Sequence, residues 1–339
     1  MSNPIAKTLP AEWHPQRFVQ LTWPHKNTDW AHILNQANDC FTNLAAAIVR
    51  FENLLIVCQS KQDVQQLLAD IDQSKITFVE LPSNDTWARD HGGVTILENG
   101  KKLIYDFGFN GWGLKYPANF DNQITAKLYK KGIFGKNVSY NNQLNFILEG
   151  GSFESDGQGT LMTTSACLLA ENRNNKTKSE LEEKLKDLFG LTRILWINHG
   201  YLAGDDTDTH VDMLARFCTP DTIAYVKCDD EHDEHHKELE RMEKELQTFR
   251  QSDGTPYQLL PLPMGDASYD ENGERLPVSY ANFLIINGAV LLPFYDSPKD
   301  EIAKKQLEKV FSNREIIGIN CNTLIRQHGS LHCSAMQFV

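Results

Sequence analysis

The chain has 339 residues, of which 41% are hydrophobic and 23% are charged, and its formal net charge at pH 7 is −12. This length and composition are typical of a globular protein of one large or two ordinary domains, with enough apolar material for a large core. The excess of acidic residues argues against a nucleic-acid surface and favours a cationic ligand. Because no apolar run approaches the ~18 residues of a membrane span, no membrane association is expected.

The N-terminus and the cysteines predict a cytoplasmic location. Residues 1–7 lack the basic and then apolar segments of a signal peptide. The seven cysteines are an odd number, and none of them forms a C-x-x-C pair. Most lie in or beside apolar runs, as reduced and buried cysteines do in cytoplasmic proteins. Composition leaves the oligomeric state open, and a homo-oligomer is compatible with it.

Helical and extended segments alternate along the chain. In the first half, apolar spacing predicts helices at 29–51 and 62–71, strands at 54–58, 76–81, 144–148 and 160–169, and a hairpin at 94–107. In the second half, it predicts helices at 178–189, 233–251 and 300–311, a strand at 193–197, and a hairpin at 277–292. Both hairpins turn at an Asn-Gly pair, which is the strongest short hairpin signal.

The order of these elements predicts an α/β fold. Strand, strand, helix and strand recur several times, and no low-complexity linker interrupts them. A repeated unit of about one fifth of the chain would suit a closed, quasi-symmetric assembly. A doubly wound sheet is the physical alternative, although neither G-x-G-x-x-G nor G-x-x-x-x-G-K-[ST] occurs in the sequence.

The most unusual stretch is 199–212, which holds four aspartates and two histidines in fourteen residues. In extended geometry His210 and Asp212 would share one face, with Val211 on the other. A histidine beside a carboxylate can transfer protons, hold a cation, or do both. A solvated acidic loop is the alternative interpretation of this stretch.

Other candidate residues lie at turns and strand ends. They are Asp90, Glu149, Asp206, Asp212, His210 and Cys333. Cys333 lies between His332 and Ser334 in a polar segment, which makes it a candidate nucleophile. Three chemistries fit the set: a metallohydrolase, a cysteine hydrolase, and a binding module for a cation. Because the H-E-x-x-H spacing is absent and few convergent ligands are visible, the cysteine hydrolase is favoured. The histidines at 232, 235 and 236 are predicted to lie on a surface helix rather than at a metal site.

Several motifs together resemble those of a known family. Trp87-Ala88-Arg89-Asp90, Glu149-Gly150-Gly151, the run at 205–212 and Leu331-His332-Cys333 resemble the motif set of the agmatine deiminases. That family includes bacterial peptidylarginine deiminase-like proteins and belongs to the guanidine-modifying superfamily. The segments 9–13, 23–24 and 277–283 are similar as well. The resemblance therefore spans nearly the whole chain and implies a single catalytic domain, 1–339.

The resemblance implies a fold and a reaction. The fold would be a five-bladed α/β propeller (pentein) of ββαβ-type units with pseudo-fivefold symmetry. The reaction would be hydrolysis of agmatine to N-carbamoylputrescine and ammonia through a covalent cysteine thiouronium, without metal or cofactor. Cys333 would be the nucleophile and His210 the general acid and base, oriented by Glu149. Asp90 and Asp212 would hold the guanidinium. Weaker assignments within the same site give Asp206 the distal amine and Trp87 the alkyl chain.

The sequence also departs from the common pattern of this family. The run 327–330 replaces a glycine-rich segment, Asp205 stands where many relatives have glutamate, and Thr209 replaces a glycine. These changes bear on the substrate more than on the chemistry. A deiminase of free or peptidyl arginine is therefore one alternative function. A propeller that binds polyamines without catalysis is the other.

Overall fold

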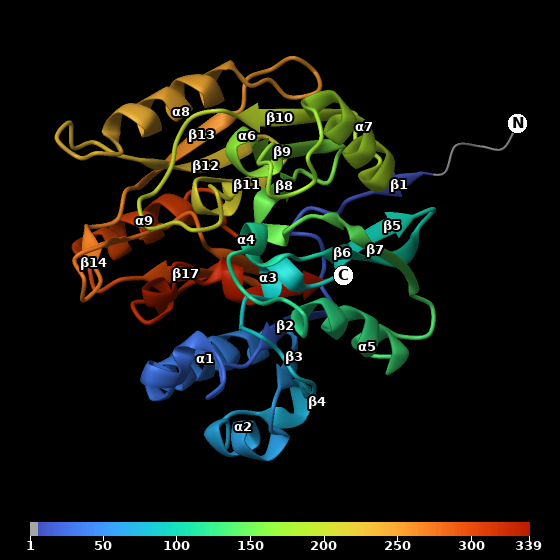
Figure 1. The fold of residues 1–339 in the computed structure, drawn as a ribbon. Coiled ribbons are helices and arrows are strands. Elements are labelled where there is room, and N and C mark those ends of the chain that lie inside the picture. Colours follow the sequence, from blue (N-terminus) through green and yellow to red (C-terminus); the bar gives the residue numbers. More distant parts are fainter. Residues whose placement is uncertain (1–5) are drawn as a thin grey trace, which may run out of the picture.

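The structure is a computed structural model that describes residues 6–339. The first five residues, and with them most of the segment used to judge a signal peptide, lie outside the described residues. Within the described part the apolar runs form five sheets of three or four strands and one two-stranded hairpin, β14 (Ser268–Tyr269) with β15 (Arg275–Leu276). The chain is therefore a mixed α/β protein, as the order of its elements predicts (Figure 1).

Four of the sheets are built in the same way from consecutive segments. Their strands are β5 (Val94–Glu98), β6 (Lys101–Gly108) and β7 (Ser139–Ile147); β8 (Phe153–Ser155), β9 (Thr160–Thr164) and β10 (Arg193–Ile197); β11 (Ala215–Thr219), β12 (Thr222–Lys227) and β13 (Gln258–Pro263); and β16 (Leu284–Ile286), β17 (Ala289–Phe294) and β18 (Glu315–Asn320). In each sheet the first two strands are antiparallel, and the second and third are parallel. Parallel neighbours need a crossover connection. The crossovers contain α5 (Ile124–Lys130), α7 (Lys178–Phe189), α8 (His236–Thr248) and α9 (Pro298–Glu308).

The fifth sheet joins the two ends of the chain. The C-terminal strand β19 (Ala335–Phe338) pairs antiparallel with β2 (Phe18–Thr22), and β2 continues in parallel to β3 (Asn53–Cys58) and β4 (Ile76–Glu80). Helices α1 (Leu34–Val49) and α2 (Lys61–Leu67) form its crossovers. This pairing holds the segment around Cys333 in place, because β19 begins only two residues after that cysteine.

The sequence predicts many of these elements, with several errors. The Asn99-Gly100 hairpin is confirmed, and so is the helix 178–189, which ends at Gly190 in the left-handed conformation (φ 69°). The predicted strand 160–169 is wrong beyond Thr164, because Thr164 caps the short helix α6 (Ser165–Leu168). The predicted helix 233–251 is too long at both ends, and α5 was not predicted at all.

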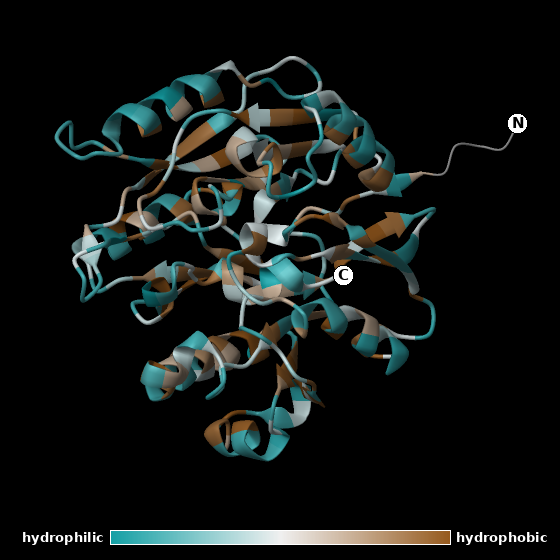
Figure 2. Ribbon diagram, viewed as in Figure 1, coloured by the Kyte–Doolittle hydropathy of each residue, from teal (hydrophilic) through white to brown (hydrophobic). Residues whose placement is uncertain are grey.

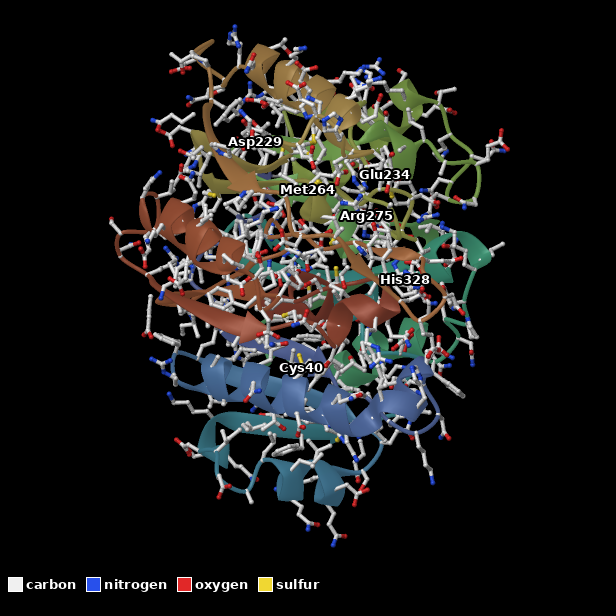
Figure 3. All side chains as sticks on the ribbon, turned by 90° about the vertical axis from the view of Figure 1, so that its left-hand side faces the viewer. Cys40, Asp229, Glu234, Met264, Arg275 and His328 are labelled. Atoms are coloured by element: carbon white, nitrogen blue, oxygen red, sulfur yellow. The ribbon has the colours of Figure 1, made fainter. Side chains whose placement is uncertain are left out.

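The predicted surface setting is wrong for one of the three clustered histidines. His235 is buried, its Nδ1 lies 2.6 Å from Asp233 Oδ1, and its Nε2 accepts a hydrogen bond from the backbone N–H of Ala203. Arg275 forms an ion pair with the same Asp233 and another with Glu234; Glu234 and Arg275 are labelled in Figure 3. His235 therefore anchors the loop at 203 rather than facing solvent.

Apolar side chains are gathered in the sheets and on the inner faces of the helices. Figure 2 shows hydrophobic strands inside and hydrophilic outer faces on α7 and α8. Within residues 6–339 every helix is too short or too polar to cross a membrane. In Figure 1 the long helices lie toward the outside, and the one-turn helix α3 (Ala88–His91) lies in the middle, where it contacts segments from both ends of the chain.

Candidate active site

Asp90 lies on α3 and is held by two donors. Its Oδ1 accepts from the backbone N–H of Gly151, and its Oδ2 accepts from Trp112 Nε1, each at 2.9 Å. Burial and the nearby charge of Asp212 raise the pKa of Asp90 well above its ordinary value. Trp112 was missed as a site residue, although its loop is recognisable in the sequence by alternating glycines and aromatics. That loop is ordered and buried at Trp112, which adopts a left-handed backbone (φ 53°).

Gly151 marks the point where three predicted residues converge. A Cβ atom at this glycine would lie 2.7 Å from His210 Nδ1, 2.9 Å from Asp212 Oδ2 and 2.9 Å from Asp90 Oδ1. Such contacts are far too short for any side chain, so only glycine fits. The absent side chain lets two carboxylates and an imidazole surround one small volume.

His210 is fully buried beside these carboxylates. Its Nδ1 lies 3.7 Å from Asp90 Oδ1, and neither ring nitrogen has a hydrogen-bond partner. Burial lowers its pKa to about 4, so the imidazole is neutral near pH 7. The predicted extended geometry holds at His210 but is wrong from Val211, where a 3₁₀ turn (Val211–Met213) begins. His210 and Asp212 nevertheless both face Gly151.

Glu149 ends the segment after β7 and is fully buried. Arg173 Nε lies 2.6 Å from its Oε1, and the structure contains no hydrogen bond between Glu149 and His210. The two side chains are nonetheless close, because atoms of Glu149, Cys167 and His210 lie within 4.8 Å of one another. The role of Glu149 in orienting His210 stays a prediction. Arg173 was missed, and nothing in its sequence context indicates this contact.

Cys333 lies in a 3₁₀ turn (His332–Ser334) just before β19. Its Sγ is 3.8 Å from Asp212 Oδ2 and accepts from Asn282 Nδ2 at 3.3 Å. Burial, together with the charges of Asp212 and Asp90, raises the pKa of the Cys333 thiol well above its ordinary value. Asn282 was also missed, although it lies in the segment 277–283 that carries part of the family resemblance.

Asp90, Glu149, His210, Asp212 and Cys333 are here called the acceptor cluster. Glu149 is paired with Arg173, but Asp212 Oδ1 and both ring nitrogens of His210 are buried without a hydrogen-bond partner. Buried polar atoms are normally paired, so a group of unpaired acceptors in one place calls for a ligand that supplies donors.

A narrow cavity leads from Cys333 to the surface. It is lined by Asp29, Asp85, Trp87, Asp90, Trp112, Tyr116, Asp206, Thr207, Gln327, His328, Gly329 and Cys333. Asp206 lies away from the acceptor cluster and accepts a hydrogen bond from Tyr116 Oη at 2.8 Å. Trp87 packs against Trp30 with ring centroids 5.7 Å apart, and Gly329 lies against its indole. The lining therefore offers carboxylates and aromatic faces but no lysine or arginine.

His328 borders this cavity in the segment where the sequence departs from the family pattern. Its backbone is left-handed (φ 64°), a conformation in which histidine is more often found than most residues. Its Nδ1 lies 2.8 Å from the carbonyl oxygen of Gly204 and donates to it. The residue, labelled in Figure 3, thereby ties the segment 327–329 to the loop that carries Asp206.

Among residues 6–339, two groups of side chains have the composition of metal ligands. One is Glu149, Cys167 and His210, and the other is Glu12, Glu154 and His332. In both groups the carboxylates already face an arginine: Arg173 pairs with Glu149, and Arg216 pairs with Glu12 and Glu154. The positive charge that such carboxylates need is thus supplied by the chain itself.

Comparison with known proteins gives concordant matches over the full length. The model of the Porphyromonas-type peptidyl-arginine deiminase family matches residues 8–338. Agmatine deiminase from Pseudomonas aeruginosa strain LESB58 is 31% identical over 367 aligned positions, which cover 99% of this chain and 98% of that protein.

Two solved structures are similar throughout. A structure of C. jejuni agmatine deiminase, a cysteine-to-serine variant with substrate bound, is 37% identical with a TM-score of 0.92 and covers 100% of this chain and 98% of that one. A Porphyromonas gingivalis protein named as a candidate arginine deiminase is 50% identical with a TM-score of 0.95, with 98% of each chain covered. Both similarities extend over the acceptor cluster and the cavity.

Proposed function

Because this chain belongs to the Porphyromonas-type peptidyl-arginine deiminase family, we propose that it hydrolyses agmatine to N-carbamoylputrescine and ammonia. The observation that carries the proposal is the acceptor cluster. A guanidinium group has only N–H donors and no acceptor, so it is the complement of a buried set of unpaired carboxylate and imidazole acceptors. Its planar fork also suits two carboxylates.

The protonation states of the free enzyme suit a reaction that starts when substrate binds. Cys333 is a thiol with a raised pKa, and His210 is neutral with a lowered pKa. A bound guanidinium would offset the charges of Asp90 and Asp212, which favours the thiolate. The thiol proton then passes to His210, and Cys333 Sγ attacks the guanidinium carbon to form a carbon–sulfur bond.

The remaining steps return the enzyme to its first state. His210 gives its proton to one nitrogen, the carbon–nitrogen bond breaks, ammonia leaves, and a thiouronium remains on Cys333. His210 next removes a proton from water, the resulting hydroxide adds to the carbon, and the carbon–sulfur bond breaks to give the ureido product. One released proton restores the thiol, and the other leaves with ammonia as ammonium. General acid and base catalysis of this kind contributes about a hundred- to ten-thousand-fold.

The cavity lining supports agmatine over arginine as the substrate. Asp206, Asp85 and Asp29 lie along it, and none of the lining residues is a lysine or arginine. Carboxylates suit the distal ammonium of agmatine, whereas the carboxylate of free arginine would meet like charges along this lining. Trp87 and Trp112 offer apolar faces for the four-carbon chain.

The finer features of fold and setting belong to the same proposal. We propose that the five similar sheets are blades of a propeller with pseudo-fivefold symmetry, formed by one domain; their shared pattern of antiparallel and then parallel neighbours supports this. We also propose a cytoplasmic location, because all seven cysteines are free thiols and all are buried. A homo-oligomer and the lack of a nucleic-acid partner stay predictions.

The decisive experiment compares the wild type with Cys333→Ser. Each is incubated with agmatine, free arginine and an arginine-containing peptide, with and without chelator, and ammonia and ureido product are measured. We expect product from agmatine alone, unaffected by chelator, and no product from the serine variant. Cys228→Ser is the matched control, since Cys228 lies at the edge of the core and its Sγ donates a hydrogen bond to the carbonyl oxygen of Asp230.

Each alternative has its own result in this experiment. Product from arginine or the peptide would replace agmatine as the substrate. Loss of activity with chelator would support the metallohydrolase hypothesis instead. Binding of agmatine without any product, measured by calorimetry, would leave a polyamine-binding protein.

A further inference from the structure

Two family-like motifs each contain a buried residue that has no part in the reaction described above. One is the segment 9–13 near the N-terminus, which contains Glu12. The other is Leu331-His332-Cys333, whose histidine precedes the nucleophile. Glu12 and His332 are both buried, and they meet in the structure although 320 positions separate them in the chain.

His332 forms a bridge between two carboxylates. Its Nδ1 lies 2.7 Å from Asp212 Oδ2, and its Nε2 lies 2.7 Å from Glu12 Oε2. The backbone N–H groups of His332 and Cys333 both donate to Asn282 Oδ1, at 2.8 and 3.3 Å, which fixes the ring relative to the nucleophile. These contacts hold the imidazole in one position between Glu12 and Asp212.

Both ring nitrogens of His332 face carboxylates that carry depressed pKa values. Although burial alone would raise it, the pKa of Glu12 is lowered by Arg216 and His332, and the pKa of Asp212 is lowered by its contact with His332. Arg216 pairs with Glu12 and Glu154, and Arg89 Nε contacts the carbonyl oxygen of His332.

Because of the bridge, the two carboxylate oxygens of Asp212 have different surroundings. Oδ2 is occupied by His332 and by the Cys333 thiol, whereas Oδ1 is buried without a partner. A carboxylate held through one oxygen cannot rotate the free oxygen away without breaking a charge-assisted hydrogen bond. The imidazole therefore fixes the rotation of the Asp212 carboxylate relative to Cys333.

We propose that His332, supported by Glu12, is a positioning residue that fixes the Asp212 carboxylate beside Cys333, in the orientation that meets the guanidinium. This inference rests on the proposed function, since it names what the positioned carboxylate binds. It also gives the N-terminal motif a role in catalysis, because Glu12 fixes the far side of the ring.

The test compares two variants that each keep half of the bridge. In His332→Asn the amide nitrogen takes about the place of Nδ1 and can still donate to Asp212. In His332→Gln it takes about the place of Nε2 and can donate only to Glu12. We expect kcat/KM for agmatine to fall about a hundred-fold in His332→Gln and less than about ten-fold in His332→Asn. A role limited to filling the core or neutralising Glu12 predicts equal losses or the reverse order, and either result would overturn the proposal.

Folding and substrate identity are controlled separately. Thermal unfolding shows whether both variants are folded at the assay temperature. If one is not, Glu12→Gln, which leaves both ring nitrogens of His332 in place, is expected to lower kcat/KM by about ten-fold, and an unchanged value would overturn the proposal.

If the wild type releases no ammonia from any guanidine, the proposed function fails, and the bridge can be tested without substrate. Release of Asp212 would remove a charge that suppresses the thiolate of Cys333. Alkylation of Cys333 by iodoacetamide, followed by mass spectrometry, is then expected to be faster in His332→Gln than in His332→Asn. Equal rates would overturn the positioning role.

Discussion

Two buried clusters of charge meet at His332 in this molecule, and they are built in opposite ways. The acceptor cluster reaches the cavity at Asp90 and Cys333, and it has buried atoms without a hydrogen-bond partner on Asp212 and His210. Behind it lies a paired network of Glu12, Glu154, Arg216 and His332, in which both carboxylates, the guanidinium and both ring nitrogens have partners. His332 joins the two clusters through Asp212.

The contrast separates a structural cluster from a functional one. A buried charge that is fully paired contributes little net free energy, but the loss of one partner is strongly destabilising. A buried acceptor without a partner is unfavourable for folding and persists where a ligand will pair with it. Substitutions in the acceptor cluster should therefore reduce activity more than stability, and those in the paired network should do the reverse.

The largest effect is expected for Asp90→Asn. Burial raises the pKa of Asp90, and asparagine keeps the shape of this side chain while it removes the ionisable group. The thermal midpoint should stay within the error of wild type. Loss of the charge that meets the guanidinium should lower kcat/KM for agmatine by about a hundred- to several-thousand-fold. Near-normal kinetics, or a clear fall in stability, would contradict the expectation that substitutions in the acceptor cluster reduce activity more than stability.

Arg216→Met should show the reverse effect. The arginine is fully buried between Glu12 and Glu154, and its removal leaves two carboxylates without their main cation. The free energy of unfolding should fall by about 3–5 kcal/mol, measured by denaturant titration. Adding Glu154→Gln should recover part of that loss, because it removes one of the uncompensated charges. A variant as stable as wild type would show that the network is not paired as described.

Asp121 is a buried carboxylate outside both clusters with one oxygen unpaired, and its substitution tests whether such a group simply destabilises the fold. Its Oδ1 accepts from Asn84 N, its Oδ2 has no partner, and burial raises its pKa to about 7. The folded protein therefore holds this proton more tightly than the unfolded chain does, and the associated stability is lost as pH rises from about 4 to about 7. Asp121→Asn should be more stable than wild type at about pH 8, by on the order of 1–3 kcal/mol, with little difference at about pH 4. Equal unfolding free energies of the two proteins at the higher pH would contradict this.

The smallest effect is expected for Asp206→Asn, in the half-exposed outer cavity. Its loss should raise KM for agmatine by about ten-fold with kcat little changed, because a partly solvated charge pair is weak and acts on binding alone. A guanidine with a butyl chain and no distal amine is the matched control substrate, and its KM should not change. An equal rise in KM for both substrates would show that Asp206 maintains the shape of the loop and does not bind the amine.

The sequence by itself determined the alternation of strands and helices and most candidate residues. Local signals carry this information: apolar period, Asn-Gly turns, and the glycine after the helix at 178–189 act over a few residues. The error after Thr164 has the same origin, because an apolar run of that length fits a strand or a helix equally well. Cys333 and His210 were also recognisable, since their motifs are short and continuous.

Only the tertiary structure decided which groups are paired and which are free. Arg173 beside Glu149, Trp112 beside Asp90 and Glu12 beside His332 are contacts between distant segments, and none has a local signature. The pKa shifts follow from the same contacts and from burial, which depend on the whole fold. The sequence thus indicates the chemical groups of the site. The packing of the five sheets determines which of these groups stay unpaired for the substrate.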